Sequence, residues 1–388
     1  MTTLRGMTWN HTRGYLPMVA TAQRFTELHP DIEIVWEKRS LKAFEEFPVG
    51  KLAADYDLIV IDHPFSGYAA KHGPLLPLDQ HLPAAFLADQ AANSVGQSHA
   101  SYNFAGHQWA LAIDAATPIS FWRDDLIKSL GLSVPKTWDA LLTLARAGHV
   151  EVPAAPINCL MDFYSFCLAN GETPFATRER VVTTDTGRFA IARLRELISL
   201  CDPGCWTRNP IASHNLVSSA ANQRIAYCAF AYGYSNYGRA GYADHVLTFG
   251  DVPHFNGKPL HTTLGGTGLA LSALRPNREA ALRYAQFTAS ATIQRTLFTH
   301  SGGQPGHRTA WYDVENNYAS GNYFTNTLPT LDRAYVRPRY CGYMEFQEKA
   351  APSSTPRSEA PPPTPTPSPS STPSTAKPSP TPQLSPEK

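Results

Sequence analysis

Hydrophobic and polar residues follow two different periods over the first sixty positions, which predicts strands separated by helices. Between positions 17 and 30 apolar residues recur at helical spacing, whereas residues 32–37 alternate as a strand does. Leu58–Ile61 is a continuous apolar run, typical of a strand covered on both faces. The predicted elements are a strand over 4–9, a helix from Pro17 that Pro30 ends, a strand over 32–37, a helix over 41–54 and a strand over 58–61. This order predicts a parallel α/β sheet with right-handed crossovers.

The same patterns continue in the middle of the chain. Thr137 is placed to cap a helix over 138–146, with Asp139 near the positive end of its dipole. The other predicted elements are helices around 194–201 and over 279–297, and strands over 225–230 and 268–272. No internal repeat is visible, so we expect an α/β protein rather than a repeat array.

Composition narrows the class of protein. The chain has 388 residues, enough for two lobes, and 33 basic against 32 acidic residues leave a formal charge of +1. This balance argues against a nucleic-acid partner, which usually requires a strongly basic face. The six cysteines include no Cys-x-x-Cys and no pairs at zinc-finger spacing, so we expect neither a metal nor a cofactor.

The two ends of the chain differ from the rest. Of the last 38 residues, Ala351–Lys388, 28 are Pro, Ser or Thr, which predicts an extended, disordered tail. Such a tail suits a spacer, a glycosylated stalk or a docking ligand, or is a tolerated appendage. No apolar stretch reaches the roughly 18 residues of a membrane span, and the N-terminus lacks the apolar core of a signal peptide.

Polar and aromatic residues follow each of the first three predicted strands. Ligands of open parallel sheets bind beyond the carboxyl ends of the strands, where helix N-termini also point N–H groups. This rule selects six residues as candidate ligand-binding residues: Trp9, Asn10, His11, Arg39, Asp62 and His63. An aromatic face beside directional polar groups is the usual composition of a small-molecule site, although each residue taken singly also suits a solvated loop.

Two further clusters follow predicted strands or run into one. Tyr232, Tyr234 and Asn236 lie in a Tyr- and Gly-rich stretch, where tyrosine offers an amphipathic ring. Gly265, Gly266 and Thr267 lead into the strand near 268 and lack the Gly-Lys-Ser/Thr ending of a phosphate loop. They therefore suggest a tight turn that exposes N–H donors to a ligand rather than a nucleotide site.

Several longer segments carry a family resemblance. Tyr56–Leu82 and Phe104–Ala145, followed by LGGTGLALSA, NREAALRYAQFTAS and SGGQPGHRTA, resemble in order and spacing the extracellular solute-binding proteins, family 1, of carbohydrate ABC importers. The matches cover residues 4 to 345. The resemblance implies the type II periplasmic-binding-protein fold, in which two α/β lobes, each with a central, mostly parallel sheet flanked by helices, are joined by a hinge.

The resemblance also implies a division of the chain. Lobe 1 would comprise residues 1–112 plus 262–310, and lobe 2 residues 113–261 plus 311–350, with 351–388 as the tail. Asp114 at the first crossing, the Gly265–Thr267 turn at the return crossing and Arg308 in the closing turn would then face the cleft. Departures from the family pattern are the Trp-Asn-His-Thr-Arg after the first strand and the missing signal peptide.

By resemblance, the function is capture of a small polar solute without chemistry, with an ABC transporter permease as partner. We expect a monomer with no cofactor and no nucleic acid, in the periplasm or outside the cell, with a cytoplasmic location left open. Trp9 and Tyr232 or Tyr234 would stack on the ligand, and Asp62 and Asp114 would accept hydroxyl hydrogen bonds. Asn10, Asn236 and N–H groups around Gly266 would complete the contacts. These groups favour a sugar, whereas basic side chains near the same cleft favour an organic acid: His11, Arg13, Arg39, His63 and Arg308.

Two alternatives remain at this point. A cytosolic ligand sensor would explain the missing signal peptide, with the tail as a docking segment. An enzyme on the same fold would have to use His11, His63, Asp62, Asp114 and Cys228, but no nucleophile motif or diagnostic carboxylate pair is present. For the binding protein, the hypothesis is that Trp9→Ala and Asp62→Ala each weaken ligand binding without unfolding the chain.

Overall fold

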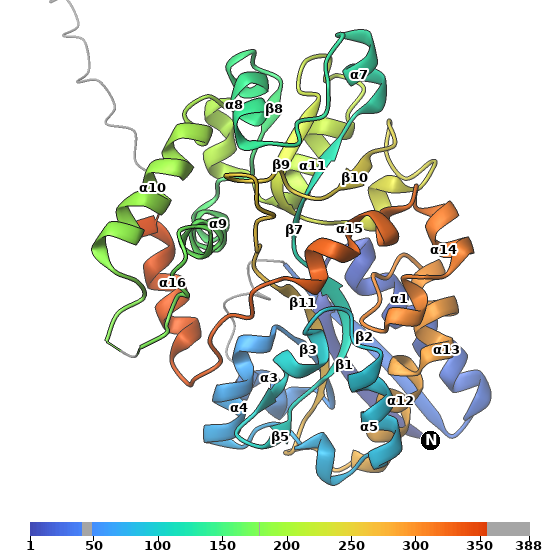
Figure 1. Ribbon diagram of the computed structural model, residues 1–388. Helices are drawn as coiled ribbons and strands as arrows, with labels where there is room; N and C mark the ends of the chain where they lie inside the picture. Colours follow the sequence, from blue (N-terminus) through green and yellow to red (C-terminus); the bar gives the residue numbers. More distant parts are fainter. Residues whose placement is uncertain (41–48, 178, 355–388) are drawn as a thin grey trace, which may run out of the picture. The chain divides into compact units, whose positions relative to one another are not determined.

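The computed structural model describes residues 1–40, 49–177 and 179–354, and two β-sheets organise them (Figure 1). The first sheet has the order β2-β1-β3-β11-β6. Its strands are β1 (Thr2–Trp9), β2 (Ile32–Arg39), β3 (Leu58–Ile61), β6 (Leu111–Ala116) and β11 (Gly265–Leu271). β1 is parallel to β2 and β3, whereas β11 is antiparallel to its neighbours β3 and β6, so four of the five strands share one direction.

The second sheet has the order β10-β7-β9-β8. Its strands are β7 (Pro118–Trp122), β8 (Val150–Glu151), β9 (Tyr227–Tyr232) and β10 (Thr248–Gly250). β7 is antiparallel to β9 and β10, and β9 is parallel to β8, so three of the four strands share a direction. Most strands of each sheet therefore share one direction, although two of the four pairings in the first sheet and two of the three in the second are antiparallel. A small hairpin pairs β4 (Asn103–Phe104) with β5 (His107–Gln108).

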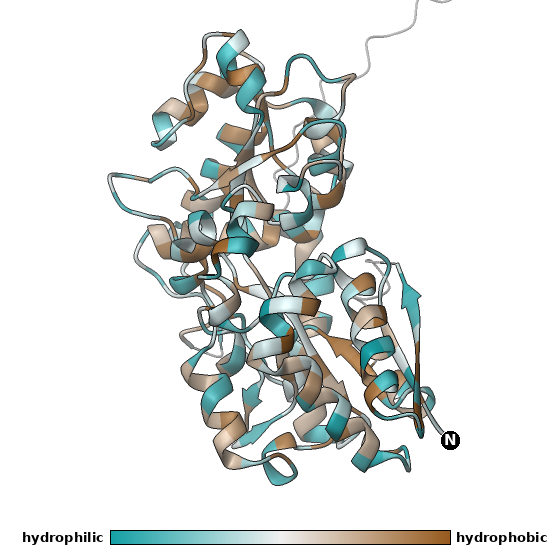
Figure 2. Cartoon of the chain, turned by 90° about the vertical axis from the view of Figure 1, so that its right-hand side faces the viewer, coloured by the Kyte–Doolittle hydropathy of each residue, from teal (hydrophilic) through white to brown (hydrophobic). Residues whose placement is uncertain are grey.

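Helices cover both faces of the first sheet, which explains the continuous apolar run of β3. Leu58 and Val60 join a core with α1 (Thr12–Leu28) and α12 (Arg278–Ala289). Ile59 and Ile61 point to the other face, where they pack with α3 (Val49–Asp55) and α4 (Ser66–His72). Figure 2 shows brown, apolar segments in strands of the sheets, and apolar and polar residues mixed along the helices.

The second sheet is also covered on both faces. The core on one face includes α8 (Trp138–Arg146), α9 (Pro156–Ala169) and α10 (Thr184–Ile198). The other core includes α11 (Pro210–Ser218) and α15 (Tyr323–Asp332), and α16 (Tyr343–Ser354) packs on α9 (Figure 1). The remaining helical segments are α5 (Ala84–Ala92), α6 (Ser98–Ser101), α7 (Asp124–Ser129), α13 (Ala291–Ile293), α14 (Val314–Ala319), η1 (His63–Phe65), η2 (Leu78–Gln80), η3 (Pro203–Thr207), η4 (Ser235–Gly238), η5 (Gln294–Phe298) and η6 (Arg308–Ala310).

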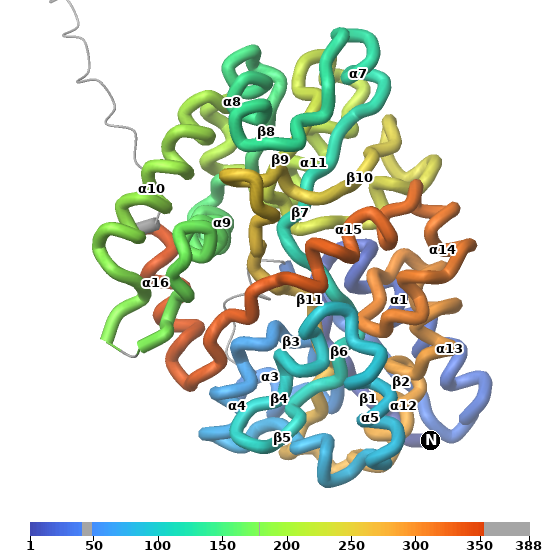
Figure 3. Tube along the Cα trace, in the orientation of Figure 1, coloured from blue at the N-terminus to red at the C-terminus, as the bar shows by residue number. Residues whose placement is uncertain are grey.

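Two chain passages between the sheets lie next to each other (Figure 3). The first is Thr117, between β6 and β7, and the second contains Thr262 and Thr263, just before β11. The Oγ1 atoms of Thr117 and Thr262 are 2.7 Å apart, and the Thr117 hydroxyl donates to the Thr263 carbonyl at 3.1 Å. All three side chains are buried. The two passages are thus fastened to each other where the chain runs from one sheet to the other.

Several predicted elements occur with the predicted bounds, and others differ for local reasons. β3 is Leu58–Ile61, and Thr137 Oγ1 caps α8 by accepting from the Ala140 N–H at 3.3 Å. α1 begins at Thr12 rather than Pro17 because His11 Nδ1 accepts from the Arg13 N–H at 3.0 Å and caps the helix. The helix expected over 279–297 is broken at Ser290, whose backbone is extended.

Two predictions fall partly outside the described residues. The helix expected over 41–54 is described only from residue 49, where α3 begins. The tail was expected from Ala351, but α16 continues to Ser354 and Ala351 is buried, so the first residues of that segment are helical. The rest of the tail, 355–388, lies outside the described residues. Within the described part of the chain, no helix has the length and apolar character that a bilayer span requires.

Candidate functional site

A cavity of about 90 Å³ lies between the two sheets. Strand ends, helix ends and the segment between α15 and α16 all contribute to its walls. The lining residues are Trp9, Arg13, Asp62, Ala116, Ile157, Asn158, Met161, Pro210, Tyr232, Tyr234, Gly265, Gly266, Thr267, Arg337 and Gln347. Because both sheets contribute, a solute held here would contact both halves of the molecule at once.

The first turn of α1 brings a paired arginine into the cavity wall. Arg13 Nε donates to Asp114 Oδ2 at 2.8 Å, and Nη2 donates to Asp114 Oδ1. Arg13 Nη1 donates to the Gly233 carbonyl, just beyond β9, at 2.8 Å, and the guanidinium lies 4.8 Å from the centre of the Tyr234 ring. Burial alone would lower the pKa of Arg13, but Asp114 raises it above its ordinary value. The guanidinium therefore stays charged and links helix α1 to the second sheet.

A second buried ion pair joins β3 to the C-terminal segment. Arg337 Nη2 donates to both carboxylate oxygens of Asp62, at 2.7 and 2.6 Å, and Nη1 donates to Gln347 Oε1 at 2.8 Å. Asp62 also caps η1 by accepting from the His63 N–H at 2.8 Å. Burial would raise the pKa of Asp62, but the attraction of Arg337 lowers it well below its ordinary value. Asp62 is thus an ionised carboxylate whose charge Arg337 compensates.

Trp9 lines the cavity from within the core of the first sheet. Its side chain is only 4% exposed and belongs to the apolar cluster beneath α1. A Cβ atom on Gly14 would lie 2.3 Å from the indole ring, so this close packing of strand end and helix requires glycine at position 14. Trp9→Ala would therefore remove core packing, at a cost of about 3–5 kcal/mol in unfolding free energy. Trp9→Ala therefore cannot test ligand binding separately from folding, which the hypothesis from the sequence required.

The glycine pair at the start of β11 is required by close packing. Gly266 has φ +96°, and a Cβ atom there would lie 2.3 Å from the Asp114 carbonyl oxygen. A Cβ atom on Gly265 would lie 2.5 Å from the Tyr232 ring. The register of β11 with β6 shifts between Thr267 and Gly268. Glycine at positions 265 and 266 therefore allows the Tyr232 ring of the second sheet to pack against the backbone of the first sheet, beside the cavity.

Half of the residues selected from the sequence lie together in this wall. They are Trp9, Asp62, Tyr232, Tyr234, Gly265, Gly266 and Thr267. The strand-end rule accounts for the first two, and the Tyr- and Gly-rich clusters account for the rest. The other seven selected residues do not line the cavity.

Asp114 and His63 lie behind the wall rather than in it. Asp114 is 1% exposed and its carboxylate is occupied by Arg13, so it positions that arginine instead of accepting from a ligand. His63 is equally buried, with Nδ1 3.2 Å from Asp62 Oδ1. Burial and the nearby Arg337 lower the pKa of His63 to about 4, so the ring is neutral beside the carboxylate that it supports.

Three other selected residues are occupied by local structure at the ends of β1 and β2. Asn10 is exposed, and its N–H donates to the Arg39 carbonyl at 2.6 Å. Arg39 is the last residue of β2 rather than part of a following loop. His11 caps α1, as described above, and burial lowers its pKa to about 3. The strand-end rule failed here because β1 and β2 continue their hydrogen-bonding ladder up to the turn.

Asn236 and Arg308 are also structural. The Asn236 amide donates to the Gly302 carbonyl at 3.1 Å. Arg308 forms a two-pronged ion pair with Asp332, and its Nε donates to the Ser94 carbonyl at 2.9 Å. Both side chains tie neighbouring segments together and are absent from the cavity wall.

The sequence missed several residues of the wall. Arg13 was noted only as a nearby charge, and Asn158 and Met161 lie on α9, whose apolar sequence gives no sign of a binding role. Arg337 and Gln347 come from the far end of the chain. The available signal for Arg13 was its place shortly after the first predicted strand; for the others we find no local signal.

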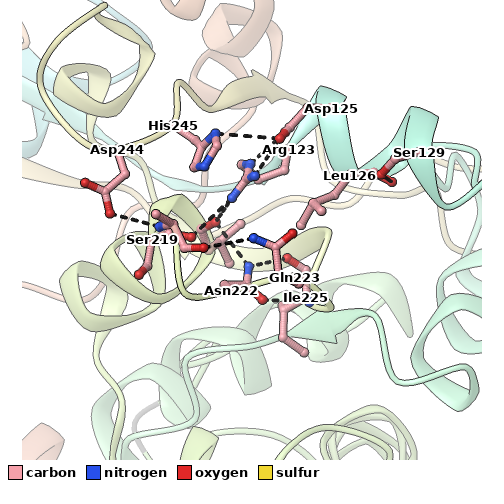
Figure 4. Close-up of polar contacts among 12 residues, drawn as sticks. Arg123, Asp125, Leu126, Ser129, Ser219, Asn222, Gln223, Ile225, Asp244 and His245 are labelled. Atoms are coloured by element: carbon pink, nitrogen blue, oxygen red, sulfur yellow. Dashed lines mark hydrogen bonds and ion pairs between the residues drawn. The ribbon is translucent and has the colours of Figure 1, made fainter.

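The Trp-Arg-Asp-Asp stretch at the start of α7 forms a separate polar cluster. Figure 4 shows Arg123 reaching Asp125 and the loop that carries Ser219. The Arg123 Nε and Nη2 atoms donate to the two carboxylate oxygens of Asp125, at 2.6 and 2.5 Å. The Arg123 Nη1 atom donates to the Val217 and Ser219 carbonyls, at 3.2 and 3.3 Å. Arg123 is 1% exposed, so its side chain holds the loop of Val217 and Ser219 in place and does not face a ligand.

We expect Arg123→Ala to lower the free energy of unfolding by about 2–3 kcal/mol, because buried carbonyls lose a charged donor, and to leave ligand affinity unchanged. Urea unfolding and calorimetric titration measure the two effects. Lys349→Ala is the matched control, since it breaks the exposed pair with Glu345 and should cost less than about 1 kcal/mol. A large loss of affinity in Arg123→Ala would place this cluster in the binding site.

Comparison with known proteins gives a consistent result. A model of the bacterial extracellular solute-binding proteins matches residues 8–165. The structure of maltose-bound MalE3 from T. maritima superposes with a TM-score of 0.76 at 16% identity, covering 92% of this chain and 94% of that one. A solute-binding protein of Agrobacterium radiobacter K84 in complex with ribitol gives 0.74 at 18% identity, covering 91% and 93%. UgpB of Mycobacterium tuberculosis in complex with glycerophosphocholine gives 0.71 at 16%, covering 92% and 94%.

Proposed function

We propose that the chain captures a small, sugar-like solute in the cavity between its sheets, as its match over residues 8–165 to the bacterial extracellular solute-binding proteins supports. The fold is that of the two-lobed, type II periplasmic binding proteins. In this proposal the solute passes to the permease of an ABC importer, and the protein acts as a monomer outside the cytoplasmic membrane. The family consists of binding proteins, and the proposed role includes no chemistry on the solute.

The lobes are assigned by the sheets. Lobe 1 comprises the first sheet, to which the expected segment 262–310 contributes β11. Lobe 2 comprises the second sheet, and the expected segment 311–350 packs against it. We place the first boundary at Thr117 rather than after residue 112, because β6 pairs with β11 of the first sheet as far as Ala116. The fastened passages at Thr117 and Thr262 form the hinge in this assignment.

The observation that carries the proposal is that one cavity has walls from both sheets. Trp9, Asp62 and Thr267 come from the first sheet, whereas Tyr232 and Asn158 come from the second sheet and its covering helix α9. A solute that contacts both lobes favours the closed arrangement, because opening would remove half of its contacts. Micromolar capture would correspond to about −8 kcal/mol of binding free energy.

The solute class is supported by the composition of the wall and by similar proteins. Aromatic rings beside hydrogen-bonding groups suit the apolar face and the hydroxyls of a sugar. Two of the similar structures contain maltose and the sugar alcohol ribitol, whereas a third contains the phosphodiester glycerophosphocholine. We therefore propose a carbohydrate-like ligand for this chain.

Calorimetric titration of the chain with a panel of monosaccharides, disaccharides, sugar alcohols and organic acids tests the proposal. We expect at least one carbohydrate-like compound to bind with 1:1 stoichiometry. Gly265→Ala should weaken that binding at least 10-fold, because its Cβ would meet the Tyr232 ring at 2.5 Å and push the ring into the cavity.

Gly187→Ala is the matched control. Gly187 lies in α10, and the nearest atom to its Cβ would be a Val182 methyl group at 3.9 Å. This variant should bind like the wild type and gain up to about 1 kcal/mol in stability, because alanine has the higher helix propensity. If no compound of the panel binds, or if Gly265→Ala binds as the wild type does, the proposed site is wrong.

A further inference from the structure

The segment between α15 and α16, residues 333–342, lies against lobe 1, although both of its flanking helices pack in lobe 2 (Figure 1). We call this segment the strap. At its start, the Tyr335 N–H donates to the Thr262 carbonyl at 2.8 Å, and the Leu264 N–H donates to the Tyr335 carbonyl at 2.7 Å. The strap therefore begins beside the passages that join the two sheets and runs from there onto lobe 1.

Two arginine side chains bind the strap to lobe 1. Arg337 holds both carboxylate oxygens of Asp62, which follows β3. Arg339 Nη1 donates to the Ala100 and Asn103 carbonyls, at 2.9 and 2.6 Å. Hydrogen bonds from a charged donor are stronger than those between neutral groups, so these contacts give the strap a defined position on lobe 1.

The backbone of the strap lies directly on α4. A Cβ atom on Gly67, in the first turn of that helix, would lie 2.7 Å from the Cys341 nitrogen and closer still to the Arg339 carbonyl oxygen. The Cys341 thiol lies 3.6 Å from His72 Nε2, in the last turn of the same helix. Glycine at position 67 therefore allows a close approach of strap and helix that any larger residue would prevent.

The C-terminal end of the strap is anchored in lobe 2 by α16. Tyr343, the first residue of that helix, is fully buried, and its hydroxyl donates to the Tyr164 hydroxyl of α9 at 3.2 Å. The Phe346 ring packs on Phe175, with ring centres 5.3 Å apart. This packing is apolar and buried, whereas the bonds from Arg339 to lobe 1 are exposed. Separation of the lobes would therefore break the contacts of the strap with lobe 1 before those of α16 with α9.

The position of these contacts relates them to opening of the cavity. Arg337 lines the cavity, and Arg339 and Cys341 lie further along the strap, away from its pairing with Thr262. Bending at the passages between the sheets would move α4 away from α16, so all three contacts with lobe 1 would be lost together. Contacts that exist only in one arrangement of two lobes stabilise that arrangement.

We propose that the strap is a latch, which holds the two lobes together without a solute and slows the exchange of solute with the cavity. Gly67 and Arg339 are positioning residues in this latch, since neither lines the cavity. The effect on solute exchange rests on the proposed function, whereas the effect on the unliganded chain does not.

Gly67→Ala tests whether the strap is held on α4. Alanine has the higher helix propensity, so only its collision with the strap is unfavourable. Reaction with N-ethylmaleimide, followed at each cysteine by mass spectrometry, measures the exposure of the thiols. Cys341 reports on the strap, and the fully buried Cys228 reports on global unfolding. We expect Cys341 to react at least 10-fold faster in the unliganded variant than in the wild type, with the rate at Cys228 unchanged.

Two further variants complete this test. Arg339→Met removes the charged donor and should also accelerate the reaction of Cys341. Gly187→Ala, in α10, should react as the wild type does. Thermal unfolding verifies that each variant folds. A wild-type rate at Cys341 in folded Gly67→Ala and Arg339→Met would overturn the proposal.

Small-angle X-ray scattering of the full, unliganded chain tests whether the strap holds the lobes together. We expect a larger radius of gyration in Gly67→Ala and in Arg339→Met than in the wild type. An unchanged radius, with Cys341 reacting faster, would show that the strap is not a latch.

Stopped-flow dissociation of a solute that binds in the calorimetric screen measures the effect on exchange. We expect release to be at least 10-fold faster from Gly67→Ala than from the wild type. An unchanged rate would overturn the latch and leave the proposed function standing. If no compound of the panel binds, the proposed function fails, and the scattering result alone decides on the latch.

Discussion

Replacing Arg13 by methionine is expected to lower the free energy of unfolding by about 3–5 kcal/mol, because Asp114 would remain as a buried carboxylate without its cation. Both side chains are at most 4% exposed, so water cannot take the place of the guanidinium without opening the structure. The bond from Arg13 to the Gly233 carbonyl would be lost as well. Urea unfolding at pH 7 measures the loss.

A double-mutant cycle separates the ion pair from general damage to α1. In Arg13→Met combined with Asp114→Leu, no buried charge is left alone, so much of the lost stability should return. Arg24→Met is the matched control on the same helix, since its pair with Glu27 is half-exposed and should contribute less than about 1 kcal/mol. A loss below about 1 kcal/mol in Arg13→Met would mean that Asp114 is not a buried, unpaired carboxylate in the variant, because it is hydrated or, since burial raises its pKa, protonated.

Lowering the pH from 7.5 to 5 is expected to remove a stabilising contribution of His63 and His214, because both rings are buried and neutral in the folded chain. His11, whose pKa burial lowers to about 3, acts in the same direction. Burial, with the nearby Arg337, lowers the pKa of His63 to about 4, and burial lowers the pKa of His214 to about 3. In the unfolded chain each would titrate near 6.5, so the unfolded state binds more protons below that pH. Their stabilising contribution is therefore complete above pH 6.5 and is lost progressively toward pH 4.

At pH 5 the two groups together account for a loss of about 4 kcal/mol relative to pH 7.5. Urea unfolding at the two pH values measures it. His214→Asn retains a donor for the Pro210 carbonyl but does not titrate, so it should reduce the loss at pH 5 by about 2 kcal/mol. His81→Asn, at an exposed position, should leave the pH dependence as in the wild type. If stability falls between pH 7.5 and pH 5 by the same amount in His214→Asn as in the wild type, the His214 ring is not held in its neutral form by burial.

The first sheet was largely predictable, because local pattern and burial agree there. A strand covered on both faces must be apolar throughout, and all four residues of 58–61 are apolar and lie in the cores of the two faces. The helix after Thr137 begins with a side-chain cap, which is a local signal. The helix near 290 was not predictable in the same way, since its apolar spacing continues through the break at Ser290.

The candidate site was predictable where the strand ends define it and not where tertiary pairing does. Trp9 is the last residue of β1 and Asp62 follows β3, and both residues line the cavity. Asp114 was also expected there, but its partner Arg13 is 101 positions away, and no sequence pattern shows that the two charges satisfy each other. Arg337 was missed for the same reason, because its pairing with Asp62 spans 275 positions.

A crystal structure of the chain with a sugar or sugar alcohol that binds in the calorimetric screen tests the central claim most directly. The account predicts the solute in the cavity between the sheets, in contact with wall residues of both, such as Thr267 and Tyr232. A solute bound on another surface, away from these residues, would contradict it.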